Sequence, residues 1–497
     1  MRRLFSIVVS LSLTALFSVG CKVGGNNSSM PLPVRYDEID IKGELSYRLQ
    51  QSFDVLNSSD SQDLAILALV TDASASRKAS QKLNEIILAF PSHLNGLGYI
   101  GSEDSEPDER TFADNGLILR GLCAYYNMSS NEKALDWIRS VASGLFVRNK
   151  EVFMNYSLAP GLDGLVEAYR LVGTPEMKEV IDSMATRFLE TDLAAVKAGT
   201  HASLSACRGL VSYAEITGDP KWVAEAESRW NVYKEYGMTE NYGSYTQMGL
   251  YEGHADPSAT ADSYILALKL WQHTRKSEYL KEAQLIYYNA LCHVQRGDGS
   301  FGLDTCPGEA SGTDLSVVTD EPFPMGTMSG AEGLATAAAC FWMREGNTFY
   351  VTTPRSSTLS AEGLELEMTT DYPFEGILVL DVKSNLTGSG VNVKVYVPDW
   401  MLLSTIQYDG KILPAKVGDD GFLTFEKLKT GDRILFDYSF SPRQEPVVNV
   451  HNTKPGQARY FSGPFILNEE GTPVYHLMDT TVTKASGYHH QILFNGF

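Results

Sequence analysis

The sequence predicts a multidomain α+β protein in which an (α/α)6 helical toroid is followed by an antiparallel β-sandwich. Twelve amphipathic helical patterns lie between about Asp40 and Glu345, short polar turns pair them, and the apolar period changes to two after Asn347. We therefore expect a toroid over residues 40–345, a sandwich over 346–446 and a β-rich segment over 447–497.

The first residues have the pattern of an export signal. Arg2 and Arg3 precede an apolar stretch that ends at Ser18-Val19-Gly20-Cys21. Small residues before a cysteine are typical of a bacterial lipoprotein signal, so we expect a signal peptide over residues 1–20, lipidation of Cys21 and a flexible tether over 21–39. This predicts a lipid-anchored protein of the bacterial cell envelope, periplasmic or on the outer-membrane surface. The alternative, a membrane-spanning anchor, would be short for a bilayer.

The net charge bears on the class of partner, and the cysteines bear on disulfides and metal binding. The chain has 61 Asp and Glu against 41 Lys and Arg, a net charge of -20, which disfavours a nucleic-acid partner. Four cysteines lie in apolar helical runs and are expected as buried free thiols: Cys123, Cys207, Cys292 and Cys340. Cys306 lies in a loop and could pair with Cys292. The sequence has no CxxC pair, the spacing that would indicate a zinc site.

Polar turns recur between the helical patterns. We expect helix–turn–helix units around the segments 126–131, 171–175, 216–220 and 273–277, each with an N-cap residue or a proline that begins the next helix. Apolar stripes follow these turns, at Trp222, Ala226, Trp230 and Tyr233, and from Leu280 to Leu291. Six such hairpins can bury the apolar faces of their helices by closing into a ring, which is the arrangement we expect. An open superhelix is the alternative. The Gly-rich loops 237–259 and 297–329 are candidates for the ring's rim.

Short alternating runs after Asn347 predict strands. They include residues 364–368, 376–380, 391–397 and 433–438, each bounded by Gly, Pro, Asp or Asn. Their number and regular spacing predict the sandwich.

Three stretches resemble the β-L-arabinofuranosidase group, glycoside hydrolase families 127 and 146. The first is Thr200-His201-Ala202-Ser203 with Thr217-Gly218-Asp219-Pro220. The second runs from Ala261-Asp262-Ser263-Tyr264 to Gly297-Asp298-Gly299. The third includes Val397-Pro398-Asp399-Trp400 and Gly463-Pro464. The resemblance covers most of residues 110–465 and implies a toroid-plus-sandwich glycosidase.

The sequence departs from this family at its metal site. The resemblance implies a zinc ion held by a Glu and three Cys, one of which is the nucleophile. Ala259 and Ala261 stand at two of the matching positions, and the segment Met325 to Glu332 has no cysteine. Ala, Met and Gly do not bind zinc, and a thiolate mechanism needs a thiol. We therefore predict no metal and no cofactor.

Carboxyl groups remain available for glycosidic bond cleavage, which commonly uses an acid and a second carboxylate. Glu252 lies in a loop comparable to the one that holds the family's acid. Asp262 lies one turn into the next helix, and Glu332 matches a recurring family Glu. We predict these three as catalytic; the alternatives are a solvated loop carboxylate, a helix-start charge and a helix-interior glutamate paired with a neighbour.

Substrate contacts are predicted around the same segments. His201 matches a family residue that contacts the sugar, and the other candidates are Tyr242, Tyr251, His254 and Asp256. The predicted function is an exported lipoprotein glycoside hydrolase, exo-acting on oligosaccharides from polysaccharide breakdown. The alternatives are a carbohydrate-binding protein without turnover and a polysaccharide lyase. In the lyase, His201, Asn241 and Tyr242 would supply the base and its partners.

Overall fold

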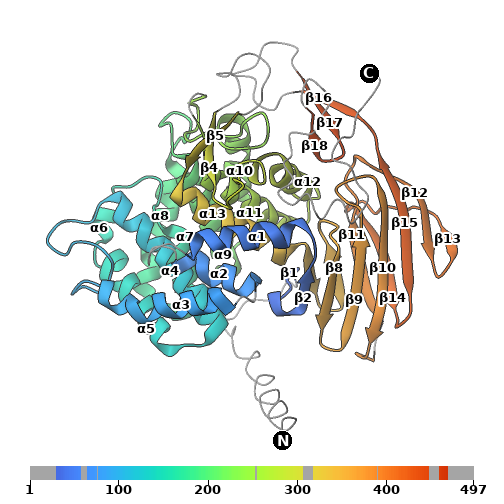
Figure 1. The fold of residues 1–497 in the computed structure, drawn as a ribbon. Helices are drawn as coiled ribbons and strands as arrows, with labels where there is room; N and C mark the ends of the chain where they lie inside the picture. The colour runs from blue at the N-terminus through green and yellow to red at the C-terminus, as the bar shows by residue number, and fades with distance from the viewer. Residues whose placement is uncertain are drawn as a thin grey trace, which may run out of the picture.

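The computed structural model describes residues 30–57, 64–74, 77–251, 254–305, 317–388, 390–446 and 458–467. Its helices occupy the first part of the chain and its large sheets the second, side by side (Figure 1). The helices are α1 (Glu44–Leu56), α2 (Leu64–Ser74), α3 (Arg77–Ala89), α4 (Glu109–Ser129), α5 (Glu132–Val141), α6 (Lys150–Phe153), α7 (Leu162–Val172), α8 (Pro175–Glu190), α9 (Thr200–Thr217), α10 (Lys221–Tyr236), α11 (Pro257–Thr274), α12 (Glu278–Ile286) and α13 (Pro324–Cys340).

Six of these helices form a closed inner ring. In ring order they are α2, α4, α7, α9, α11 and α13; each packs on the next, and α13 packs back on α2. Each also packs on an outer helix, in the pairs α2–α3, α4–α5, α7–α8, α9–α10, α11–α12 and α13–α1. The first helix therefore pairs with the last, so the hairpins close a circle instead of extending as an open superhelix.

The four predicted turns separate helices as expected. Residues 126–131, 171–175, 216–220 and 273–277 lie at the joints α4–α5, α7–α8, α9–α10 and α11–α12. The Asn131 side chain accepts a hydrogen bond from the Lys133 amide, and Thr174 accepts one from the Met177 amide. Ser277, by contrast, makes no side-chain cap, so α12 begins without this device.

Glycines let three inner helices approach closely. A Cβ atom on Gly116 of α4 would lie 2.2 Å from the Gly161 Cα atom, and one on Gly164 of α7 would lie 1.9 Å from the Gly116 carbonyl oxygen. Gly209 of α9 faces the backbone of Asp163 in the same way. Because no side chain stands between them, the backbones of α4, α7 and α9 pack directly on one another.

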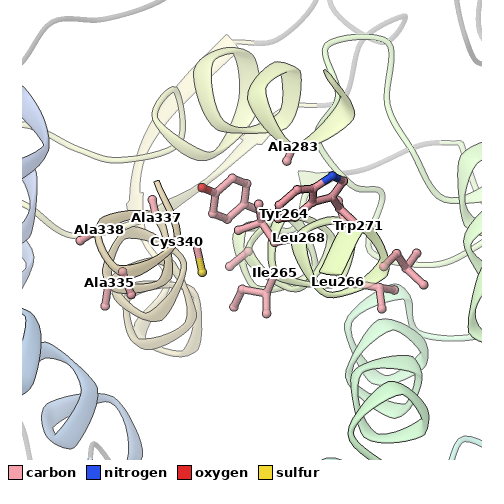
Figure 2. Packing of buried hydrophobic residues seen from close by; sticks show 14 of the residues in the cluster. Tyr264, Ile265, Leu266, Leu268, Trp271, Ala283, Ala335, Ala337, Ala338 and Cys340 are labelled. Atoms are coloured by element: carbon pink, nitrogen blue, oxygen red, sulfur yellow. The ribbon is translucent and has the colours of Figure 1, made fainter. Parts of the chain in front are cut away.

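Apolar side chains fill the other side of the ring. Figure 2 shows α11 residues such as Tyr264, Leu268 and Trp271 facing Ala283 of α12 and the alanine-rich α13. The predicted stripes 222–233 and 280–291 are buried as well. Cys123, Cys207, Cys292 and Cys340 are buried free thiols, which confirms that prediction. Cys306 lies outside the described residues.

The strands are β1 (Leu32–Pro33), β2 (Ile39–Ile41), β3 (His254–Ala255), β4 (Gly302–Thr305), β5 (Val317–Pro322), β6 (Trp342–Glu345), β7 (Thr348–Val351), β8 (Ser357–Ala361), β9 (Leu364–Thr370), β10 (Gly376–Asn385), β11 (Val391–Tyr396), β12 (Met401–Tyr408), β13 (Lys411–Leu413), β14 (Phe422–Leu428), β15 (Arg433–Phe440), β16 (Arg443–Pro446), β17 (Ala458–Ser462) and β18 (Phe465–Ile466). All four strand runs predicted from the sequence correspond to strands of this set, with the run 391–397 extending one residue past β11.

Most strands of two large sheets follow the ring in the chain. Their orders are β1-β6-β7-β11-β14 and β13-β12-β15-β10-β9-β8-β2, and buried residues of both belong to one hydrophobic cluster with the helices. The pairing departs from a purely antiparallel arrangement, because β7 and β11 run parallel. Trp271 of α11 packs against Tyr350 and Phe422, which joins the ring to the five-stranded sheet.

The segment before α1 differs from the predicted tether. Strand β1 pairs with β6 and β2 pairs with β8, so each adds an edge strand to a large sheet. Tyr36 between them donates a hydrogen bond from its hydroxyl to the Ala335 carbonyl in α13. Residues 30–39 are thus part of the fold, because their backbone groups complete two sheets, and the prediction of a tether up to residue 39 is wrong for these residues.

Export, the lipid anchor and most of the C-terminal β-rich segment concern residues that the structure does not describe. Of residues 447–497 it describes 458–467, which hold β17 and β18. Within the part of the chain that is described, no helix combines the length and apolar character needed to cross a bilayer.

We predict that Gly164→Ala destabilises the ring. The added methyl group would overlap the Gly116 carbonyl, and the two backbones cannot separate without disturbing α9. A loss of about 1–3 kcal/mol in the free energy of unfolding is expected, measured by urea denaturation. Gly297→Ala is the control, because no heavy atom lies within 4 Å of the place that its added methyl group would take. Equal stability of the two variants would contradict this packing.

Candidate functional site

The inner helices all enter the ring from the same end. Apart from the short α6, inner and outer helices alternate along the chain from α2 onward, so each outer-to-inner connection returns to that end. Backbone bridges join three of these connections: Gly199 pairs with Gln247, Tyr245 with Ala255, and His254 with Thr305. The loop 237–256 therefore lies at the rim, as the sequence predicts.

Six ionisable side chains form a continuous chain of ion pairs inside the ring. Their order is Asp163, Arg120, Glu332, Arg208, Asp262 and His201. The five nitrogen–oxygen distances are 2.6, 2.7, 2.6, 2.5 and 2.6 Å in that order. Five inner helices contribute to this charge chain: α7, α4, α13, α9 and α11.

The charge chain crosses the interior of the ring. Glu332 on α13 reaches Arg120 on α4 although α2 separates these helices in the ring, and it reaches Arg208 on α9 past α11. Arg120, Asp163, Arg208, Asp262 and Glu332 are all buried, whereas a quarter of the His201 side chain is exposed. Solvent therefore meets the charge chain at His201.

His201 carries a positive charge at neutral pH. Burial alone would lower its pKa, but the nearby charge of Asp262 and the hydrogen bond to it outweigh burial and raise the pKa to about 9. Asp256 adds to this effect and Arg120 opposes it. A histidine in this state donates hydrogen bonds and does not accept a proton.

Asp262 and Glu332 are brought together with His201, as the sequence predicts, but both carboxylates are fully occupied. Burial would raise the pKa of Asp262, yet His201 and Arg208 more than offset burial, and the pKa is lowered. Each Glu332 oxygen accepts from a different arginine. A general acid must hold a proton near neutral pH, which the environment of Asp262 opposes.

Asp256 is the other carboxyl group whose charge acts on His201. It caps α11 by accepting a hydrogen bond from the Ser258 amide at 2.8 Å, and it is half-buried. Burial raises the pKa of Asp256, against the charge of His201 and the backbone hydrogen bonds that lower it. Two buried hydroxyl oxygens next to this pair in the sequence, Thr200 Oγ1 and Ser258 Oγ, make no hydrogen bond within the described residues.

The remaining predicted contacts are divided between the surface and the core. His254 is exposed on β3, and Tyr251 is half-buried with its ring 5.6 Å from that of Tyr245. Tyr242 is 4% exposed because Arg459 stacks on its ring at 4.5 Å, so it packs in the core and is no platform for a sugar. Glu252 lies outside the described residues.

The sequence analysis did not identify three members of the charge chain: Arg120, Arg208 and Asp163. Each arginine lies in an apolar helical run followed by the same residues, Arg120-Gly121-Leu122 and Arg208-Gly209-Leu210. A charge on the buried face of an amphipathic helix needs a buried partner, so this repeated string was a signal for an internal ion pair.

Glu240 was also missed. It is fully buried in the rim loop, where burial raises its pKa to about 7 despite the Tyr245 hydroxyl 3.3 Å away and the charge of Arg459. Arg459 donates to the Glu240 carbonyl oxygen at 2.8 Å, which ties the loop to β17.

The residues do not fit the family's zinc. Ala259 and Ala261 are buried and offer no ligand atom, and no three His, Cys, Asp or Glu side chains of the described residues could together hold a metal ion. Burial raises the pKa of Cys207 to about 12, that of Cys292 to about 11 and that of Cys340 to about 12, so these thiols are not nucleophiles at neutral pH. The absence of zinc stays a prediction, which metal analysis of the purified protein tests.

Comparison with solved structures identifies the fold. A GH127 β-arabinofuranosidase aligns with a TM-score of 0.69 at 13% identity, covering 89% of this chain and 86% of its own. A protein described as a glycoside hydrolase gives 0.71 at 14%, covering 88% and 83%. A GH127 β-L-arabinofuranosidase from Geobacillus stearothermophilus T6 gives 0.64 at 12%, covering 85% and 80%.

The chain has the fold of the GH127 β-arabinofuranosidases. The fold that the sequence resemblance implied is thus confirmed, at 12–14% sequence identity. No protein-family model matches the chain. No curated protein matches it either.

We predict that His201 makes stability pH-dependent. Its pKa is raised above the unfolded value of about 6.5, so its contribution is complete below pH 6.5 and is lost as pH rises through about 9. The native protein should exceed His201→Gln in free energy of unfolding at pH 6, and this difference should decrease by about 2 kcal/mol between pH 6 and pH 10. Urea denaturation at several pH values measures it; a difference independent of pH would contradict a charged His201.

Proposed function

We propose that the protein is a glycoside hydrolase that acts on oligosaccharides at the rim of its helical ring. The observation that carries this proposal is the convergence on His201 of Asp262, from α11, and Asp256, the last residue of the rim loop 237–256. Supporting it, the described structure has the fold of enzymes named as β-arabinofuranosidases. Exo-action on fragments from polysaccharide breakdown is part of the proposal, as is a sandwich formed by the two large sheets.

In the proposed mechanism the rim loop supplies the acid. Glu252 is our first candidate for protonating the leaving group, and Asp256, whose pKa burial raises, is the second. His201 would donate a hydrogen bond to the sugar. Asp262 and Glu332 enter the mechanism through the charge chain, because both their oxygens are already bound.

A binding protein without turnover is the second candidate. The observation in its favour is the occupation of Asp262 and Glu332 by arginine and histidine, which leaves no second carboxylate among these residues for hydrolysis. A lyase gains no such support: His201 is a cation near neutral pH, and Asn241 bonds Thr239 and Asn289.

We predict that the protein cleaves members of a panel of plant and microbial oligosaccharides, and that Glu252→Gln reduces kcat at least about 100-fold while sugar binding persists. Product release is measured by chromatography and binding by calorimetry. Asp298→Asn is the control and should keep full activity, because Asp298 accepts hydrogen bonds from the amide and the hydroxyl of Ser300 within its own turn.

The outcomes separate the candidates. Loss of turnover in Asp256→Asn, with full activity in Glu252→Gln, would move the acid to Asp256. Binding of a sugar with no turnover of any panel member would favour the binding protein, and neither binding nor turnover would contradict both.

We also propose that the chain is exported and anchored by lipid on Cys21, in the bacterial cell envelope. The support is the sequence pattern of residues 2–21. In cells labelled with a fatty acid, the protein should incorporate label and sediment with membranes, and Cys21→Ser should do neither. Labelling of the Cys21→Ser variant would contradict an anchor at this residue.

A further inference from the structure

We propose that Asp163, Arg120, Glu332, Arg208 and Asp262 are positioning residues. Their ion pairs hold His201 with Nδ1 toward Asp262, and Nε2, which has no partner among the described residues, can then meet a ligand. The inference deepens the proposed function, and rests on it only for the sugar that His201 would meet. It assigns a role to Arg120, Arg208 and Asp163.

Each residue between the two ends of the charge chain pairs with two others, which fixes the orientation of its side chain. Arg208 donates from Nη1 to Asp262 and from Nη2 to Glu332, and Arg120 donates from the same two nitrogens to Asp163 and Glu332. Asp262 accepts from Arg208 through Oδ1 and faces His201 through Oδ2. Because both ends of each internal group are bound, turning one side chain would break two ion pairs.

Backbone packing fixes the positions from which these side chains reach. Gly116, four residues before Arg120, and Gly209, directly after Arg208, contact the backbone of α7 around Asp163. The helices that carry both arginines thus cannot shift independently. Small displacements of α13 or α4 would therefore reach His201 through Glu332.

The groups that face His201 come from several elements. Asp262 on α11 and Asp256 at the start of α11 favour its charged form, while Arg120 on α4 opposes it. Arg208 on its own helix is neutralised by Asp262 and Glu332. Removing the negative charge of Glu332 leaves Arg208 less neutralised, so the charged form of His201 should lose stability.

The test is an NMR titration of His201 in the full chain with ¹⁵N-labelled histidine, assigned by the signal that His201→Gln lacks. In the native protein we expect a midpoint near pH 9 and, above it, a proton retained on one ring nitrogen, Nδ1. Glu332→Gln should lower the midpoint by at least about half a pH unit, and Asp262→Asn should bring it below about pH 7.

Glu215→Gln is the matched control. Glu215 also lies on α9, has little exposure, and pairs with Arg170, Lys269 and His273 of the neighbouring helices. Among the described residues, no ion pair or hydrogen bond joins it to the charge chain. Its removal should leave the His201 midpoint unchanged, so a shift in Glu332→Gln alone reports the ion pairs and no general loosening of α9.

A native midpoint near 6.5, a proton on Nε2 at high pH, or equal midpoints in Glu332→Gln and Glu215→Gln would each overturn the inference. The native titration decides the first two even if a variant fails to fold. No sugar is needed, so failure of the oligosaccharide panel leaves this result standing. If the panel yields a substrate, Glu332→Gln should shift the alkaline limb of the pH profile of kcat/KM in parallel with the NMR midpoint.

Discussion

The interior of this protein depends on one shared carboxylate. Glu332 pairs with both Arg120 and Arg208, and each arginine also pairs with an aspartate of a neighbouring helix. The three carboxylates together balance the two guanidinium groups and the charged His201. Buried charges are costly unless paired and hydrogen-bonded, so none of these residues can be understood singly. Five of the six inner helices contribute a side chain to these ion pairs. The polar interior therefore helps to fix the positions of the helices, as the apolar packing around it does.

The same arrangement accounts for the difference between this chain and the enzymes whose fold it shares. The positions expected to bind metal carry alanine and methionine, and α11 instead presents Asp262 to an arginine and a histidine. The inner ring therefore contains ion-paired side chains and lacks the cysteine ligands that zinc would need. Its acid–base properties are those of a salt-bridged aspartate and a charged imidazole, which is why the proposed acid lies in the rim loop.

Much of the fold was visible in the sequence because it rests on local rules. The turn at 171–175, with Thr174 and Pro175, and the stripe from Trp222 to Tyr233 depend on residues a few positions apart. The site was less accessible. His201, Asp262 and Glu332 could be found through motifs, but Arg120 and Asp163 pair across 43 residues, and Arg120 and Glu332 across 212. Tyr242 was misjudged because its covering residue, Arg459, is more than two hundred positions away.

The pairing of α1 with α13 has a consequence for how the chain reaches its native state. The hydrogen bond between Tyr36 and Ala335 joins residues 299 positions apart, and β1 likewise pairs with β6 from far along the chain. Folding is slowed by contacts so distant in sequence. A chain emerging from the N-terminus onward cannot complete its circle of helices until the last of them has been made. Until then α1 and α2 expose the faces that α13 covers, and exposed apolar surface of this kind favours aggregation.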